Sequence, residues 1–554
     1  MPAVRHFERR DWTSAAVLAG YVLVAFVYWG ARLLPHPGRS YIGVPNDPQI
    51  FIWSLAWWPH AIAHGVNPFY THSIWAPEGV NLAWTTSVPG VALVFAPLTW
   101  LFGAVVSYNV ATVLMPALAA WTAFLLCRQL TRSLWPSLVG GYLFGFSAYM
   151  IGQIGSGHMH MDSVFLLPLV ALVVVRFIEG DLGGRGVAVW LGPLLALQLT
   201  LSTENAFTFT LALITAIVLG FLFVPTARRR LVALVPPLAA SYALAAVLVA
   251  PLVYYALSGF NSSSVNDPVP YTTDLLNLLV PTPRVLGGGA HFASTISQHF
   301  PANDGERAGY LGLPSLVIVV LFAARRWRTH AGRVLLAGFV VGVVASFGDW
   351  LVVNGHKIVT LPWEHVAYLP LFNNVLPARL MLFVVLITSI VVALWMTSSH
   401  GWIRVVLPAL AVLSFIPDPS AAAWKTAAFV PQFFRNGDVR RCIGPNENIL
   451  ILPQAKHGNG MLWQVIAGFR FRMADGYVAP DVPNDFMTTP AIARIANRQV
   501  TWPDLVSFAR AKNVTTVLVD ASQSDPWRSL LRPLAPPRAL GGVLVYRFDK
   551  TARC

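Results

Sequence analysis

The runs AFTFTLALITAIVLGFLFV (206–224), PTARRR (225–230) and LVALVPPLAASYALAAVLVAPLVYYAL (231–257) follow one another in this chain. Each apolar run is long enough to cross a bilayer, which takes about 20 residues of helix. The short gap between them holds three arginines, and the arginines of 325–333 repeat the arrangement. Basic loops between spans stay on the cytoplasmic face. This stretch therefore predicts a polytopic α-helical membrane protein whose arginines orient the chain.

The composition agrees with a chain that has the lipid bilayer as its partner. Of the 554 residues, 56% are hydrophobic and only 11% are charged, and the mean hydropathy is +0.59. A soluble globular protein carries about 25% charged residues. The formal charge of +14 could suggest nucleic acid, but the basic residues lie mostly in short loops between apolar runs, which indicates no nucleic-acid partner.

The basic loops also set the membrane topology. Residues 1–13 contain three arginines and precede the apolar run 15–34, which predicts a retained first helix with the N-terminus in the cytoplasm. The following loop, 35–104, contains two short apolar runs at 47–64 and 89–102 that suit interfacial or re-entrant helices. Counting 89–102 as a full span would place every later arginine cluster outside.

The remaining apolar runs bring the predicted number of spans to about eleven. The loops 35–104, 258–310 and 354–378 then lie outside, as does the C-terminal region. That region, 417–554, gains charge, and β-rich runs at 449–452, 516–519 and 543–548 surround a helical pattern at 504–512, which predicts a small α/β domain. Residues 1–416 form the membrane domain. The ten later spans are 105–127, 134–152, 163–179, 186–203, 206–224, 231–257, 311–324, 333–353, 379–398 and 403–417.

Asp47 is the one carboxylate in the early half of the first outer loop, directly ahead of Pro48 and a tryptophan-rich stretch. An aspartate before a proline often only caps the following helix. A carboxylate at the outer rim of a membrane protein can also act as a general base. The residues themselves leave both interpretations open.

A second polar group, His158, His160 and Asp162, follows the third predicted span. In an extended segment, side chains two apart share a face, so two imidazoles and a carboxylate could hold a divalent cation or contact a phosphate. A span exit also collects polar residues without any ligand.

Two further candidates lie near later spans. Glu306 and Tyr310 are four apart and would share one face of a helix, where they could bind substrate, although a solvated loop end explains them at least as well. Arg379 stands at the outer start of a span, where a guanidinium can bind a lipid phosphate or simply reach the headgroups. The three cysteines have no metal or redox spacing, and a Cys442–Cys554 pair stays open.

Taken together, the chain resembles the GT-C superfamily of integral-membrane glycosyltransferases, which use polyprenyl-phosphate-linked sugars. The likeness rests on the cytoplasmic N-terminus, the long first outer loop with Asp47 and interfacial helices, the many spans and the C-terminal outer domain. It covers the membrane region 1–416. The first loop carries one aspartate where some members have a carboxylate pair.

The resemblance implies that Asp47 is the general base of an inverting displacement on the outer face of the bacterial cytoplasmic membrane. The sugar, a hexose or pentose, would pass to a glycan, lipid or protein acceptor. Arg379, with His158 and His160 or a bound divalent cation, would stabilise the leaving phosphate. The competing interpretations are a lipid-linked sugar flippase or polysaccharide exporter, and an outer-face acyl or phosphoglycerol transferase.

Overall fold

The computed structural model describes residues 2–258, 267–478, 483, 490–548 and 554, with side chains from residue 12 onward. The chain forms two compact units. Unit 1 comprises Met1–Pro35, Val110–Ala250 and Asn261–Trp424, and unit 2 comprises His36–Asn109, Pro251–Phe260 and Lys425–Cys554. The division expected at 416 stays a prediction, and residues 36–109, which contain most of the first loop, belong to the same compact unit as the C-terminal residues.

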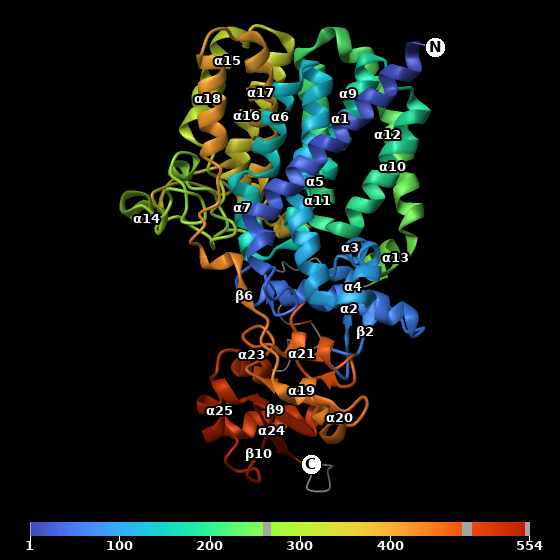
Figure 1. Ribbon diagram of the computed structural model, residues 1–554, viewed down its shortest axis with the longest axis vertical. Helices are drawn as coiled ribbons and strands as arrows, with labels where there is room; N and C mark the ends of the chain where they lie inside the picture. Colours follow the sequence, from blue (N-terminus) through green and yellow to red (C-terminus); the bar gives the residue numbers. More distant parts are fainter. Residues whose placement is uncertain (1, 259–266, 479–482, 484–489, 549–553) are drawn as a thin grey trace. The chain divides into compact units, whose positions relative to one another are not determined.

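Unit 1 is a bundle of long helices that run side by side (Figure 1). Helix α17 packs against α6, α7, α15, α16 and α18, and α10 packs against α9, α11 and α12. Most side chains of α17 are buried, as expected of a helix enclosed by other helices. The helices of this unit are α1 (Pro2–Ala25), α6 (Leu134–Gly145), α7 (Ala148–Ser156), α8 (Met159–Asp162), α9 (Leu166–Glu179), α10 (Gly184–Leu201), α11 (Thr203–Phe223), α12 (Arg228–Leu248), α15 (Leu313–Arg326), α16 (His330–Ser346), α17 (Met381–Ser398), α18 (Ile403–Leu413) and most of α5 (Ala104–Thr131).

Seven helical segments in the described part of the chain are long and apolar enough to cross a membrane. Helices α16 and α18 are shorter, and the span expected at 134–152 is divided between α6 and α7. The end of the span expected at 333–353 is instead strand β4 (Trp350–Val353), paired with β5 (His356–Thr360). The count of eleven spans stays a prediction. The seven segments are Trp12–Leu33, Ala104–Thr131, Met159–Glu179, Gly184–Leu201, Thr203–Phe223, Pro225–Leu248 and Pro377–Ser398.

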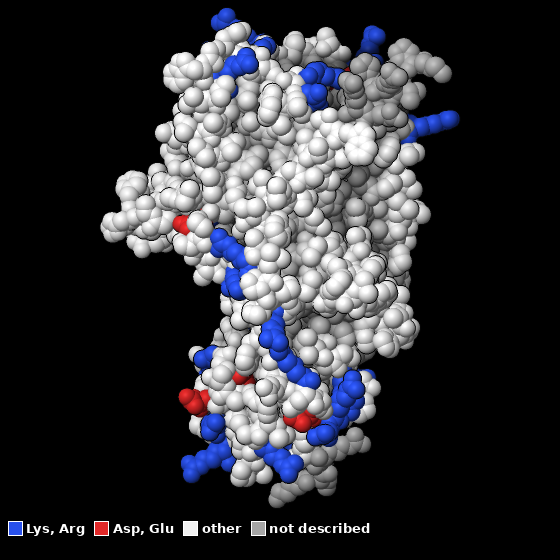
Figure 2. Space-filling view, viewed as in Figure 1, with Lys and Arg blue, Asp and Glu red and all other residues white. Residues whose placement is uncertain are grey.

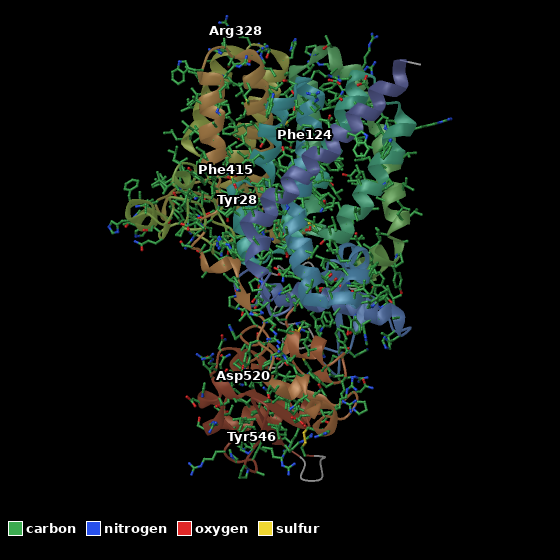
Figure 3. The ribbon with its side chains drawn as sticks, in the orientation of Figure 1. Tyr28, Phe124, Arg328, Phe415, Asp520 and Tyr546 are labelled. Atoms are coloured by element: carbon green, nitrogen blue, oxygen red, sulfur yellow. A yellow bond between two sulfur atoms is a disulfide. The ribbon has the colours of Figure 1, made fainter. Side chains whose placement is uncertain are left out.

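The arginine-rich loops of unit 1 lie together at one end of its helices, as the positive-inside pattern predicts. Figure 3 places Arg328 at this end and Phe415 toward the other end of α15 and α18, and Figure 2 shows basic side chains over the same end. Contacts between consecutive loops join them: Arg132 to Glu179 at 3.3 Å, Arg230 Nη1 to the Phe177 carbonyl at 3.0 Å, His330 Nδ1 to the Phe223 carbonyl at 2.6 Å, and Arg325 Nη1 to Ser399 Oγ at 3.3 Å.

Unit 2 contains a five-stranded sheet of order β10-β11-β9-β7-β8. Strands β7, β8 and β9 are parallel, whereas β9, β11 and β10 are antiparallel. Three strands and α24 form where the sequence predicts them. Figure 3 marks Asp520 and Tyr546 on this sheet. The elements are β7 (Asn448–Leu452), β8 (Arg472–Met473), β9 (Thr516–Asp520), β10 (Arg538–Leu540), β11 (Val543–Arg547), α19 (Gln432–Arg435), α20 (Asp438–Cys442), α21 (Gly460–Ile466), α23 (Pro490–Ala496), α24 (Trp502–Ala511) and α25 (Asp525–Leu530).

The first loop completes unit 2 by packing on the C-terminal residues. The Trp53 indole donates a hydrogen bond to Gln464 Oε1 at 2.7 Å, and the Phe469 ring lies edge-on to Trp53 and Trp57. A disulfide joins Cys442 to Cys554 in the same unit, while Cys127 is a buried free thiol. The loop contributes α2 (Asp47–Ala63), α3 (Pro89–Val94), α4 (Ala96–Phe102), the β2–β3 hairpin (Tyr70–Thr71 and Val80–Asn81), and β1 (Ser40–Tyr41), which pairs with β6 (Thr426–Ala427).

Candidate functional site

Asp47 is the first residue of α2, and its half-buried carboxylate is held from the C-terminal part of unit 2. The Tyr477 hydroxyl donates a hydrogen bond to Asp47 Oδ1 at 2.5 Å. The cap position belongs to Asn46, which makes no capping hydrogen bond and has φ of 95°, a strained value for a residue other than glycine. Asp47 is therefore not the N-cap of α2, which was one of the two roles that the sequence left open for it.

Side chains on both sides of this hydrogen bond are held in place by other contacts. Gln49, two residues after Asp47, donates to Asn459 Oδ1 at 2.9 Å and to the Gly458 carbonyl at 3.2 Å. The Lys456 ammonium lies 5.9 Å from the centroid of the Tyr477 ring. The carboxylate predicted as the general base thus sits in a polar site built from the first loop and the residues around 456–477.

A second polar cluster is buried in unit 1 and is centred on Arg379. Arg379 Nε and Nη2 both donate to Glu306 Oε1, at 2.9 and 2.7 Å, and Nη1 donates to Glu204 Oε2. Burial opposes the charge of Glu306, but Arg379 and His158 outweigh it and hold the pKa of Glu306 below its ordinary value. Because two carboxylates share one guanidinium, the cluster can serve as a structural ion network as well as a site for a ligand.

The histidines join this cluster, but they do not form the predicted metal site. His158 Nδ1 lies 2.7 Å from Gln153 Oε1, and the rings of His158 and His160 are 6.0 Å apart. Residues Met159–Asp162 form helix α8, not an extended segment, so side chains two apart diverge. Among the described residues, no group of three or more His, Cys, Asp or Glu side chains could hold a metal ion. The set His158, His160 and Asp162 does not fit a divalent cation.

Glu306 and Tyr310 do not share a helix face, because the residues between them form a turn and irregular backbone. Glu306 points to Arg379, whereas the Tyr310 ring packs on Phe415 with centroids 5.8 Å apart. Burial raises the pKa of Tyr310. The substrate-binding role predicted for this pair therefore loses its geometric basis for Tyr310, while Glu306 is part of the buried cluster.

Sequence reasoning missed several members of the two sites. Arg284 donates to the Gly152 carbonyl at 2.7 Å and to Ser156 Oγ at 2.8 Å, which anchors the long loop to α7. Glu204 is the second residue of α11 and lies in the two-residue gap between the spans expected at 186–203 and 206–224. A carboxylate so close to two apolar runs is a signal for a buried partner. Tyr477 gave no such signal, since only the fold brings it to Asp47.

Asp475, two residues before Tyr477, gives unit 2 a testable dependence on pH. It is fully buried, its Oδ2 accepts from the Ala455 amide at 2.9 Å, and its Oδ1 has no hydrogen-bond partner in the described part of the chain. Burial raises the pKa of Asp475 to about 7. The folded state therefore holds the proton of Asp475 more tightly than the unfolded state does. The resulting contribution to the free energy of unfolding is fully present below pH ~4 and is lost as the pH rises to ~7.

Replacing Asp475 with asparagine is expected to remove this loss, because the amide keeps an acceptor for Ala455 and never ionises. The variant should gain a few kcal/mol over wild type at pH 8 and little or nothing at pH 4. Denaturant unfolding followed by tryptophan fluorescence at both values measures the difference. Equal pH dependence in the two proteins would contradict the assignment.

Solved structures with the same overall fold are found for this chain. The arabinofuranosyltransferase AftD from Mycobacteria matches with a TM-score of 0.57 and 14% identity, over 98% of this chain and 40% of that one. The apo oligosaccharyltransferase from Archaeoglobus fulgidus matches with a TM-score of 0.55 and 13% identity, over 97% of this chain and 74% of that one. This chain thus spans less than half the length of AftD. The two define the class: a multi-pass membrane protein with the GT-C fold.

The family described as a domain of unknown function (DUF6311) matches residues 17–416. This chain belongs to that family. No curated protein matches it. The two solved structures confirm, at the level of the fold, the resemblance to GT-C proteins that the sequence predicts.

Proposed function

We propose that this protein is a membrane glycosyltransferase that moves a hexose or pentose from a polyprenyl-phosphate donor to an extracytoplasmic glycan, lipid or protein acceptor. The observation that carries the proposal is a GT-C fold whose first-loop carboxylate, Asp47, begins α2 and is held by the Tyr477 hydroxyl. The names of the similar structures, an arabinofuranosyltransferase and an oligosaccharyltransferase, support the reaction class.

The proposed reaction is a single inverting displacement. Asp47 takes the proton of an acceptor hydroxyl as its oxygen attacks the anomeric carbon of the donor sugar. The bond from that carbon to the phosphate oxygen breaks on the opposite face, and the polyprenyl phosphate leaves with the bonding electrons. The proton remains on Asp47 until solvent removes it. No step of this reaction requires a metal ion.

For unit 1 we propose separately that Arg379 contacts a lipid phosphate. A guanidinium has five N–H donors, and three are used on Glu306 and Glu204, which leaves one on each terminal nitrogen for phosphate oxygens. His158 and His160 lie in the same cluster and are further candidates for contact with the phosphate. The two carboxylates oppose this binding. Because lysine keeps one positive charge but loses the planar set of donors, an Arg379→Lys variant should raise KM for the donor more than it lowers kcat.

The placement of unit 2 outside the cytoplasm rests on chain connectivity. Segments of one folded unit lie on one side of a membrane, so the chain between them crosses an even number of times. The eleven predicted spans give six crossings between 109 and 251 and four between 260 and 425, whereas the long helices alone give odd numbers in both intervals. With the arginine loops in the cytoplasm, unit 2 lies outside, where the Cys442–Cys554 disulfide is stable.

Purified protein in proteoliposomes, supplied with polyprenyl-phosphate pentose and hexose donors, tests the function. We expect a new glycosidic bond, release of polyprenyl phosphate and an inverted anomeric configuration by NMR. Transbilayer movement of intact donor without release would instead identify a flippase. Retention of configuration would overturn the direct role of Asp47 in a single displacement.

Cysteine labelling tests the sidedness on which this proposal depends. In a Cys127→Ala background, Asp525→Cys should react with an impermeant maleimide in spheroplasts, and Arg328→Cys only after permeabilisation. Both positions are exposed, and the Cys442–Cys554 disulfide does not react. The reverse pattern would place the whole proposed site in the cytoplasm and overturn it.

A further inference from the structure

We propose that Tyr477 is a positioning residue for Asp47, so that the C-terminal part of unit 2 completes the site of the first loop. This inference rests on the proposed role of Asp47 as general base. Its basis is the hydrogen bond from the Tyr477 hydroxyl to Asp47 Oδ1 at 2.5 Å, between residues that are 430 positions apart in the chain.

The backbone around Tyr477 is fixed by the first loop itself. The Trp75 amide donates to the Asp475 carbonyl at 3.0 Å, and the Thr86 amide donates to the Val478 carbonyl at 3.3 Å. The Gln454 side chain adds a hydrogen bond to the Gly476 carbonyl at 3.0 Å. The backbone that carries the phenol is therefore held at its position by contacts that do not depend on Asp47.

Helix α2 is fixed independently of Tyr477. Gln49 is hydrogen-bonded to Asn459 and Gly458, and one turn later the Trp53 indole is hydrogen-bonded to Gln464. Because both partners are anchored before they meet, their hydrogen bond costs little additional ordering and selects one orientation of the carboxylate. Fixed orientation of a catalytic group is one of the contributions to rate enhancement.

The chemistry of the pair suits a general base. A phenol donating to Oδ1 favours the ionised carboxylate and directs the proton of the acceptor hydroxyl to the other oxygen. The Lys456 ammonium near the Tyr477 ring favours donation by the hydroxyl, since a cation stabilises negative charge that develops on the phenol oxygen. Tyr477 thus orients Asp47 and stabilises the negative charge on its carboxylate.

The test is a Tyr477→Phe variant assayed over a range of pH. We expect kcat to fall by about 10- to 100-fold, donor KM to change less than threefold, and the acidic limb of the pH profile to move up by about one unit. A ring that only packs would leave the limb unmoved. The matched control is Tyr70→Phe, which removes a phenol hydrogen bond to the Glu78 carbonyl in the same unit and should keep the wild-type profile.

A double-mutant comparison separates this inference from the proposed function. If Asp47→Asn lowers kcat by the roughly 10²- to 10⁴-fold expected of a lost base, adding Tyr477→Phe should cause no further loss of the residual activity, because the two act through one interaction. Normal transfer by Asp47→Asn would overturn the proposed base itself. An inactive Asp47→Asn together with a wild-type profile for Tyr477→Phe would overturn the positioning role alone.

A second substitution tests the inference in case Tyr477→Phe does not fold. Incorporation of 3-fluorotyrosine at position 477 retains the hydroxyl and makes it a stronger donor, so the acidic limb should move down, opposite to its movement in Tyr477→Phe. An unmoved limb in the fluorinated protein would contradict the inference even if Tyr477→Phe fails to fold.

Discussion

Replacing Asp47 with asparagine is expected to lower kcat by about 10²- to 10⁴-fold, the range that a general base contributes. The amide has nearly the same shape and can still accept the Tyr477 hydrogen bond through its oxygen, but it cannot take a proton. Binding of the donor should therefore change little. Initial rates of polyprenyl-phosphate release, measured against donor concentration, separate kcat from KM.

The chain offers a close control for this substitution. Asp525 also precedes a proline at the start of a helix, α25, and it lies exposed in unit 2. Asp525→Asn should transfer sugar at the wild-type rate. If both variants retain wild-type turnover, Asp47 is not the base, and the first-loop carboxylate has only a structural role.

Replacing Arg379 with leucine is expected to destabilise the protein by about 3–5 kcal/mol, because it leaves buried carboxylates without their cation. Glu306 is 2% exposed and receives two of the three hydrogen bonds that Arg379 donates. Thermal unfolding in detergent measures the loss. Adding Glu204→Gln and Glu306→Gln to the variant should recover part of it, since neutral amides need no counterion.

The pH dependence that Glu306 gives to the free energy of unfolding should also reverse in Arg379→Leu. In the wild type, the lowered pKa of Glu306 means that its stabilising contribution is present above the unfolded pKa of about 4.3 and is lost as the pH falls below it. Without Arg379, burial dominates and raises the pKa of Glu306. The deficit of Arg379→Leu should therefore be larger at pH 8 than at pH 5.

Arg307 supplies the matched control for Arg379. It forms an ion pair with the exposed Asp304 at 3.4 Å, and such pairs contribute about 0–1 kcal/mol. Arg307→Leu should thus unfold close to the wild-type temperature. An Arg379→Leu protein as stable as Arg307→Leu would show that the buried carboxylates are already neutral.

Tertiary structure overturned those expectations that depended on local backbone geometry. The histidine pair was expected on one face of an extended segment, but helix α8 forms there and turns successive side chains apart. Glu306 and Tyr310 were expected on one helix, but a turn separates their environments. Polar residues next to membrane spans carry only weak local signals for helix, strand or turn, so tertiary packing determines which backbone conformation they adopt.

The sequence alone is enough to predict the class of protein, because apolar runs of spanning length and arginine loops report directly on the solvent around each segment. It also determined where strands β7, β9 and β11 form, since buried strands carry a dense apolar signal. The contact of Tyr477 with Asp47, 430 residues away, and the sharing of Arg379 between Glu204 and Glu306 became visible only in the folded chain. Such partners are selected by the packing of whole elements, and no short-range pattern in the chain encodes which distant side chain will meet a given charge.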